Sequence, residues 1–314
     1  MLAGCNRYQS ATAPFGAEAA ALLDMTVVLV VGAVVIAAAV AAMMVAAARA
    51  PEGRLSHRGG MRLVLIAGGV VPTIVLTALL IYSLPAMRPR TVAPADLRIR
   101  VEGEQFWWRV GYRPAGGAAA TPAILSANEI RLPVGRDVLI ELTGGDVIHS
   151  FWIPGLAGKM DTIPGRINKL PVRATRAGRF RGVCTEFCGL SHALMAFEVV
   201  AMPPDAFDRW LAAQARPARP AAAAMPGARL FAANGCGGCH AIRGTGAEGA
   251  IGPDLTHFGG RRTLAAGILP MNDQNVARFI KAPARVKPGV RMPAYVHLRD
   301  AESLAIARYL QALR

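Results

Sequence analysis

Cysteine, aromatic and acidic residues are all scarce in this sequence of 314 residues. It has five cysteines, 6% aromatic residues, and 20 acidic residues against 35 lysines and arginines. Four of the cysteines fall in two short motifs, which leaves no spare pair for a structural disulfide elsewhere. The apolar stretch from Leu63 to Leu84 contains no acidic residue, so no carboxylate is available there for an intramembrane function.

Hydrophobic residues are abundant instead, at 53% with a mean hydropathy of +0.35, which indicates that part of the chain lies in lipid. The stretches Met25–Ala48 and Leu63–Leu84 are each long enough to cross a bilayer as a helix. Pro72, in the second, is tolerable because neighbouring helices can satisfy the freed carbonyl. We therefore expect a transmembrane hairpin over residues 21–90, with helices at about 25–48 and 63–84.

The loop between these helices is basic, with a single acidic residue, Glu52. Its arginines are Arg49, Arg54, Arg58 and Arg62. By the positive-inside rule this loop is cytoplasmic, so both ends of the chain lie outside. Arg88 and Arg90 oppose this orientation, but long translocated domains move largely regardless of charge.

The N-terminal segment, residues 1–20, contains a sequence from Leu2 to Cys5 that resembles the lipobox of bacterial lipoproteins. A lipobox needs a charged and an apolar region upstream, and almost nothing precedes this one. Either the start codon lies further upstream or the match is a chance one. The predicted topology places Cys5 on the outer face, where acylation occurs. A cleaved signal peptide is the alternative for the first apolar stretch, whose run is too long for a typical h-region.

Residues 91–213 change to a pattern of period two, with turn signals at Gly135, Gly144–Gly145 and Ala177–Gly178. Strands are expected at 138–143, 169–174, 180–183 and 196–201. Many short strands with such punctuation predict an all-β sandwich. A closing helix over 204–215, with Phe207 and Trp210 on its apolar face, follows. Residues 214–224, rich in alanine and proline, predict an extended linker.

The stretch from Cys184 to Met195 contains Cys184, Cys188, His192 and Met195. Two thiolates, an imidazole and a thioether form a soft donor set of the kind that copper prefers. The same spacing would line one face of a helix, but Gly189 interrupts that helix and the flanks read as strands. A metal loop is therefore predicted; a disulfide, a structural zinc site and core packing remain as alternatives.

The last segment, residues 225–314, contains the motif Cys236-Gly-Gly-Cys-His240. This is the attachment motif of c-type haem, in which Cys236 and Cys239 form thioethers and His240 is the proximal ligand. A redox dithiol or half of a zinc site is the competing interpretation. Helices are expected over 226–234 and 302–313, in a small all-α domain.

Three motifs carry a family resemblance: Asp146 to Pro154, Lys159 to Asn168, and the Cys184 stretch. Together they resemble subunit II of the haem-copper cytochrome c oxidases, in the subgroup with a cytochrome c domain fused at the C-terminus. The resemblance implies a cupredoxin-like sandwich and a class I cytochrome c domain. It also implies a dinuclear copper centre (CuA), with ligands His149, Cys184, the Glu186 backbone carbonyl, Cys188, His192 and Met195.

The same resemblance extends to the haem and to a further metal. Met292, in a Met-Pro turn, is implied as the second axial haem ligand. Met271 is the first alternative, followed by His257 and His297. Methionine ligation raises the reduction potential of the haem. The Glu186 carboxylate would face a magnesium site shared with subunit I. Asp161 would lie near the copper ligands and help to orient them.

Two positions depart from the family pattern. Phe106 stands where the family places the tryptophan that receives electrons, so Trp107 is our candidate for that role; aromatic packing is the alternative. Leu65 stands seven residues before Pro72, where the family often has the glutamate of a proton channel. No proton-channel role is therefore expected for this chain.

The expected function is electron transfer from haem c through copper to a subunit I that reduces oxygen, at the outer face of a bacterial inner membrane. Expected partners are subunits I and III, a soluble or membrane cytochrome c or an upstream cytochrome bc complex as donor, and lipid. The net charge of +15 favours acidic partners or headgroups, and the membrane topology argues against nucleic acid. The alternatives are an anchored carrier for another terminal reductase and a copper-binding assembly protein.

Overall fold

The computed structural model describes residues 7–51, 53–54, 56–88, 97–113 and 124–314. The chain divides into two compact units: residues 20–90, and residues 1–19 together with 91–314. Cys5, Glu52 and Arg90 lie outside the described residues, so lipidation of Cys5 stays a prediction.

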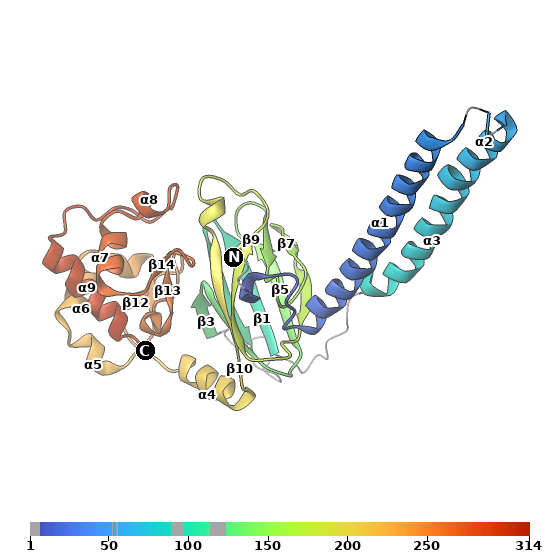
Figure 1. Cartoon of the computed structure of the whole chain (residues 1–314). Coiled ribbons are helices and arrows are strands. Elements are labelled where there is room, and N and C mark those ends of the chain that lie inside the picture. The colour runs from blue at the N-terminus through green and yellow to red at the C-terminus, as the bar shows by residue number, and fades with distance from the viewer. Residues whose placement is uncertain (1–6, 52, 55, 89–96, 114–123) are drawn as a thin grey trace. The chain divides into compact units, whose positions relative to one another are not determined.

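The smaller unit consists of two long apolar helical stretches (Figure 1). The first is α1, Ala17–Arg49; the second runs from α2, His57–Leu65, through a π-type turn, Ile66–Val70, into α3, Val71–Ser83. Both are long and apolar enough to cross a membrane. The π-type turn ends two residues before Pro72, whose ring nitrogen has no hydrogen to donate to the helix ladder.

Both helices begin earlier than predicted, at Ala17 rather than near Met25 and at His57 rather than near Leu63. The alanines from Ala17 to Ala21 are strong helix formers although they are less apolar than the stretch that follows. The second helix begins where the Ser56 side chain accepts a hydrogen bond from the Gly59 amide at 3.1 Å. Hydropathy marked the membrane-length core of each helix but not these starts.

The larger unit contains a sandwich of two five-stranded sheets. The first sheet has the order β3-β2-β1-β5-β8 and the second the order β4-β10-β9-β6-β7. Neighbouring strands are antiparallel except β1 with β5 and β4 with β10. The strands are β1 Leu97–Glu104, β2 Trp107–Arg113, β3 Ile124–Ala127, β4 Glu129–Pro133, β5 Val138–Gly144, β6 His149–Trp152, β7 Met160–Thr162, β8 Asn168–Val172, β9 Gly178–Cys184 and β10 Ala196–Met202.

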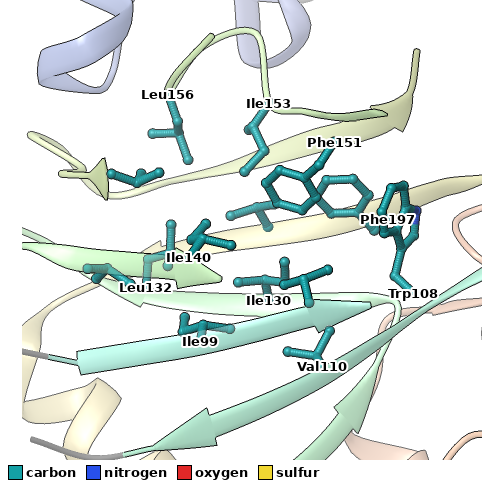
Figure 2. Close-up of a cluster of buried hydrophobic side chains, with 14 of the residues drawn as sticks. Ile99, Trp108, Val110, Ile130, Leu132, Ile140, Phe151, Ile153, Leu156 and Phe197 are labelled. Carbon is teal, nitrogen blue, oxygen red and sulfur yellow. The ribbon is translucent and has the colours of Figure 1, made fainter. Parts of the chain in front are cut away.

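The core of the sandwich lies between the two sheets and is filled by alternate residues of each strand (Figure 2). Trp108, Phe151 and Phe197 are among its largest members, and none of the three is exposed to solvent. Phe197 stacks on Phe151 with ring centroids 4.6 Å apart, and Trp108 meets both rings edge-on. The helix α4, Pro204–Gln214, covers one end through Phe207 and Leu211, as its apolar face predicted.

The described part of the N-terminal segment packs on this sandwich. Phe15 contacts the ring of Phe180 edge-on at 5.1 Å, and its amide donates to the Gly155 carbonyl at 2.7 Å. Gly16 forms a β-bridge with Ala174, and a Cβ at position 16 would overlap the backbone of Leu156. Residues just before α1 are thus part of the folded β-domain.

The C-terminal domain has its own core, built mainly by α6, α7 and α9. Its elements are α5 Pro220–Ala223, α6 Pro226–Ala233, a 3-10 turn Cys236–Gly238, β11 Ala241–Ile242, β12 Ala247–Glu248, a 3-10 turn Phe258–Gly260, β13 Thr263–Leu264, β14 Leu269–Pro270, α7 Asp273–Lys281, α8 Pro283–Val286 and α9 Asp300–Ala312. The Asn272 side chain caps α7, and Glu302 accepts the Arg299 amide at the start of α9.

The prediction of an unfolded linker at 214–224 is wrong in part. Residues 220–223 form α5, and Ala222 is buried in the core of the C-terminal domain. Pro220 stands in the first turn of α5, where its missing amide hydrogen costs nothing, and three alanines follow it. The alanine content that was interpreted as linker composition is also what lets this segment begin a helix.

Candidate copper and haem sites

The candidate copper ligands gather where three strands of the second sheet begin or end. His149 opens β6, Cys184 closes β9, and β10 starts directly after Met195. Between β9 and β10 runs the copper loop, which we define as residues 184–195. It is irregular apart from a 3-10 turn at His192–Leu194, and Gly189 lies in the left-handed region with φ of 121°. The predicted loop, rather than a helix with a sulfur stripe, is what the fold contains.

The donor atoms of these residues face one another. The Cys184 and Cys188 sulfurs are 3.9 Å apart, and one nitrogen, Nδ1 of His149, lies 3.9 Å from the Cys184 sulfur. The Cys188 sulfur is 3.7 Å from Nδ1 of His192 and 3.9 Å from the Met195 sulfur. The Glu186 carbonyl lies 3.3 Å from the Cys184 sulfur. All six predicted ligands therefore converge, and this soft donor set fits copper.

Cys184 and Cys188 form no disulfide, and each sulfur affects the pKa of the other. The Cys188 thiol donates a hydrogen bond to the Cys184 sulfur, which lowers the pKa of Cys184, and the His149 ring adds to this effect. The neighbouring Cys184 sulfur and burial together raise the pKa of Cys188. A metal ion must displace the proton on Cys188, so copper binding releases protons from this site.

His149 is fully buried and is oriented by Asp146. Its Nε2 lies 3.0 Å from Oδ1 of Asp146, so Nε2–H donates to the carboxylate and Nδ1 faces the sulfurs. Burial alone would lower the pKa of His149, but hydrogen bonds with Cys184 and Asp146 outweigh it and raise the pKa. Burial would likewise raise the pKa of Asp146, yet bonds from the Gln105 amide, His149 and the Val147 amide lower it.

The sequence also singled out Glu186, Asp161, Trp107 and Phe106 near the copper ligands. The Glu186 side chain is exposed, and Asp161 pairs with Ser150 across β6 and β7. Trp107 is half-buried at the start of β2, with the Arg109 guanidinium 4.8 Å above its ring. Phe106, beside it, is buried.

The haem motif opens into an apolar cavity. Cys236, Cys239, His240 and Met292 all line it, together with the core residues Leu255, Phe258, Ile280, Ile306 and Leu310. Its wall also includes residues 104–107 of the β1–β2 turn, so Trp107 borders the same cavity. An apolar cavity with two thiols, an imidazole and a thioether fits a c-type haem.

The His240 ring is held for metal binding. Its Nδ1 donates to the Pro253 carbonyl at 2.8 Å, which leaves Nε2 as the free ligand atom. A Cβ at Gly252 would lie 2.5 Å from the ring carbon Cε1, so only glycine fits against this face. Burial lowers the pKa of His240, which keeps the ring neutral.

The rival axial ligands lie elsewhere. Among the described residues, the cavity wall includes Met292 but neither Met271, His257 nor His297. His257 Nε2 bonds the Arg216 carbonyl at 3.0 Å, and His297 Nε2 bonds the Asn234 amide oxygen at 2.8 Å.

Three residues near the copper loop were missed by the sequence analysis: Asp146, Gln105 and Ser191. The Gln105 side-chain amide donates to the Cys188 carbonyl at 2.6 Å. Asp146 was detectable, because it stands three residues before His149 within a motif already singled out. Gln105 and Ser191 carry no comparable signal.

Known proteins are similar to both the β-domain and the C-terminal domain. The family model of the cytochrome c oxidase subunit II periplasmic domain matches residues 117–202, and that of cytochrome c matches residues 224–314. Cytochrome c oxidase subunit 2 of Alkalihalophilus pseudofirmus is 39% identical over 218 residues, covering 69% of this chain and 61% of that protein. Its namesake in Bacillus sp. PS3 is 33% identical over 265 residues, covering 80% of this chain and 72% of that protein. The chain belongs to the cytochrome c oxidase subunit 2 family.

A solved structure is also similar to part of this subunit 2. The periplasmic domain of subunit II of cytochrome oxidase (CoxB) from Bradyrhizobium japonicum is 32% identical, covers 40% of this chain and 96% of that chain, and has a TM-score of 0.34. The two matched domain types imply binding of copper and of haem. Two apolar helices joined to a periplasmic-type domain mark a membrane-anchored protein.

Proposed function

We propose that this chain transfers electrons from a covalently bound haem c to a dinuclear CuA centre, and from there to the oxygen-reducing subunit I of a respiratory cytochrome c oxidase. The observation that carries the proposal is that one compact unit contains both a convergent soft donor set and a haem cavity with its attachment motif. Neither site alone would imply a relay.

The copper would be held by His149, Cys184, Cys188, His192, Met195 and the Glu186 carbonyl. Bound copper would supply a one-electron couple. The protein holds Nδ1 of His149 toward the sulfurs and buries both cysteines in the same hydrophobic core as Phe151, Phe197 and Trp108. Burial excludes water and keeps the ligands in one arrangement in either oxidation state, which limits the reorganisation that accompanies electron transfer.

The haem would be attached through Cys236 and Cys239, with His240 and Met292 as axial ligands. Met292 is favoured over Met271 because it lines the cavity. The covalent tether keeps the donor on the same chain as the acceptor, so the effective concentration is set by the linker rather than by a soluble pool.

Trp107 is the residue that we assign to electron acceptance from the haem. It borders the haem cavity, and Gln105, two residues earlier, bonds the Cys188 carbonyl. The β1–β2 turn therefore connects the cavity wall with the backbone of a copper ligand. A Trp107→Phe variant should pass electrons from haem to copper more slowly with both cofactors in place; an unchanged rate would remove this role.

The remaining partners follow from the same assignment. Subunit I would receive the electron, and the exposed Glu186 carboxylate would bind magnesium shared with it. Subunit III, a cytochrome c or cytochrome bc complex as donor, and lipid complete the proposed partners. The chain would be a two-span protein of a bacterial inner membrane with both sites on the periplasmic side. Residues 7–16 support this topology, because they pack on the periplasmic-type domain although both apolar helices lie between the two segments in sequence.

The test is a metal and kinetic analysis of the full chain, matured with haem and reconstituted with copper. Two coppers per haem, with thiolate-to-copper absorption, are expected, and Cys184→Ser should lose the copper but keep the haem. Rapid photoreduction of the haem should then be followed by reduction of copper in the wild type alone. Haem without copper would contradict the proposal.

The two rival functions give different results. A copper-binding assembly protein would need the copper loop but no haem domain. A carrier for another terminal reductase would copurify without oxygen-reducing subunits, whereas the proposed subunit should copurify with subunit I.

A further inference from the structure

The haem domain contacts the β-domain at points that flank the copper loop. One contact segment is residues 265–267. The Ala266 carbonyl accepts the Ala196 amide at 3.1 Å, and the Gly267 carbonyl accepts the Arg181 guanidinium at 2.7 Å. Ala196 directly follows Met195, so this segment binds the end of the copper loop.

This segment is bent into an unusual shape to reach its partners. Ala265, Ala266 and Gly267 all have left-handed backbone, with φ of 55°, 62° and 80°. Two successive alanines in that region are costly, since only glycine adopts it freely. This backbone shape gives the segment a defined contact. Ala266 is 1% exposed, and its carbonyl accepts a hydrogen bond from the Ala196 amide.

The second contact segment is residues 287–291. The Pro288 carbonyl accepts the Ser191 hydroxyl at 2.6 Å, and Ser191 is fully buried. Gly289, with φ of 78°, packs so closely that a Cβ would lie 3.1 Å from the Phe106 ring and 3.3 Å from Leu190. Arg291 pairs with Asp146 at 3.2 Å. Ser191 directly precedes His192, and Arg291 directly precedes Met292.

The two segments are joined to each other by Lys287. Its side chain is almost fully buried, and its Nζ donates to the Ala265 carbonyl at 3.1 Å. A buried amino group that donates to a carbonyl of the other segment links the two segments. One connected piece of the haem domain thus contacts the copper loop at residues 190–191 and the strands on either side of the loop at Arg181 and Ala196.

We propose that residues 265–267 and 287–291 form a docking clasp that holds the haem domain on the copper loop, with Ser191 as its positioning residue on the loop. The proposal rests on the haem-to-copper function proposed above. The tether raises the local concentration of the haem domain, whereas the clasp sets its orientation. The partner of this surface is the haem domain of the same chain.

The first test is hydrogen exchange by mass spectrometry on the full chain, matured with haem and free of copper. Loss of the buried Ser191–Pro288 bond should loosen the clasp, so Ser191→Ala should speed exchange at the Ala196 amide about tenfold. Ser303→Ala is the matched control, because Ser303 is equally buried but bonds only within α9. Ser303→Ala should leave the exchange rate of the Ala196 amide unchanged. The Cys184 amide, which donates within the β-domain, should exchange at the wild-type rate in both variants.

A second pair of variants tests the fit of the clasp without removing a hydrogen-bonding group. Gly267→Val places methyl groups against Ala196 and Arg181, whereas Gly135→Val imposes the same left-handed strain where no atom lies within 4 Å. Exchange at Ala196 should accelerate in the first and stay at the wild-type rate in the second. Equal exchange in wild type, Ser191→Ala and Gly267→Val would overturn the clasp.

The kinetic measurement separates this proposal from the function on which it rests. In the chain loaded with haem and copper, Ser191→Ala and Gly267→Val should slow haem-to-copper transfer, while copper absorption stays as in wild type. If wild type transfers electrons and the variants do so equally fast, the clasp is wrong and the relay stands. If wild type transfers none although exchange shows a closed clasp, the relay fails and the docking stands.

Discussion

Asp146 offers the sharpest test of how the copper site is organised. Its Oδ1 accepts the His149 Nε2–H at 3.0 Å and the Val147 amide, and its Oδ2 accepts the Gln105 amide at 2.8 Å. In Asp146→Asn one of these oxygens becomes an NH2 group, which can accept none of the bonds. Removing such an orienting partner typically costs 10–100-fold in metal affinity, or about 1.4–2.7 kcal/mol.

The assay is a competition titration of the reduced, copper-free chain against a copper chelator of known affinity. Arg291→Gln tests whether the partner of the other carboxylate oxygen matters. Arg291 contacts only Oδ2 of Asp146 and is not a candidate copper ligand. It should leave copper affinity within about twofold of wild type. Asp205→Asn, which removes the same charge from an exposed site, controls for net charge. If Asp146→Asn binds copper as tightly as wild type, the orienting role assigned to this carboxylate is refuted.

The same site predicts a pH dependence. The pKa of His149 is raised above its ordinary value, so the folded, copper-free protein holds that proton more firmly than a free imidazole would. Copper needs the neutral Nδ1 as well as the Cys188 thiolate, so as the pH drops through this raised pKa the His149 proton should add a loss of affinity of about tenfold per pH unit to the loss caused by the Cys188 proton. Asp146→Asn removes one cause of the His149 shift, so this steeper fall should begin at a lower pH. A titration repeated across pH checks both statements.

Further variants test the haem ligand and the core. Met292→Ala should lower the haem reduction potential, because loss of the thioether ligand destabilises the reduced haem, whereas Met271→Ala should leave the potential unchanged; redox titration of the haem bands decides between them. Phe197→Ala should lower the free energy of unfolding by about 3–5 kcal/mol, since the ring is fully buried and stacked on Phe151. Gly182→Ala should also destabilise the fold, because its Cβ would lie 2.0 Å from the Phe197 ring; denaturant unfolding followed by tryptophan fluorescence measures both.

Much of the fold could be predicted because the sequence alternates between clear periodicities. The strand expected at 138–143 is β5, and the helices expected over 204–215 and 226–234 are α4 and α6. Hydropathy found both apolar helices but placed their starts too late, since helix propensity and the Ser56 cap act outside the apolar stretch. The linker was misjudged because alanine serves equally in an extended spacer and in a helical turn.

The candidate ligand positions could be picked out for a different reason. Cysteine, histidine and methionine are rare, and each has a donor atom of its own, so their spacing stands out in the sequence. The converging distances around Cys184 and Cys188 agree with that reading. Gln105 was not visible in this way, because a glutamine in a turn is ordinary and its partner, the Cys188 carbonyl, is brought near only by the fold.

The contacts between the haem domain and the β-domain show where such reasoning stops. Ser191, Arg181 and Ala196 donate to the carbonyls of Pro288, Gly267 and Ala266. Every residue has a carbonyl, so no residue type marks the acceptors, and the arginine contributes only to a net charge that suggested an acidic partner. What selects these carbonyls is backbone shape, namely the left-handed turns at 265–267 and 289. Net charge alone therefore does not identify the contact of Arg181, which donates to a backbone carbonyl of its own chain.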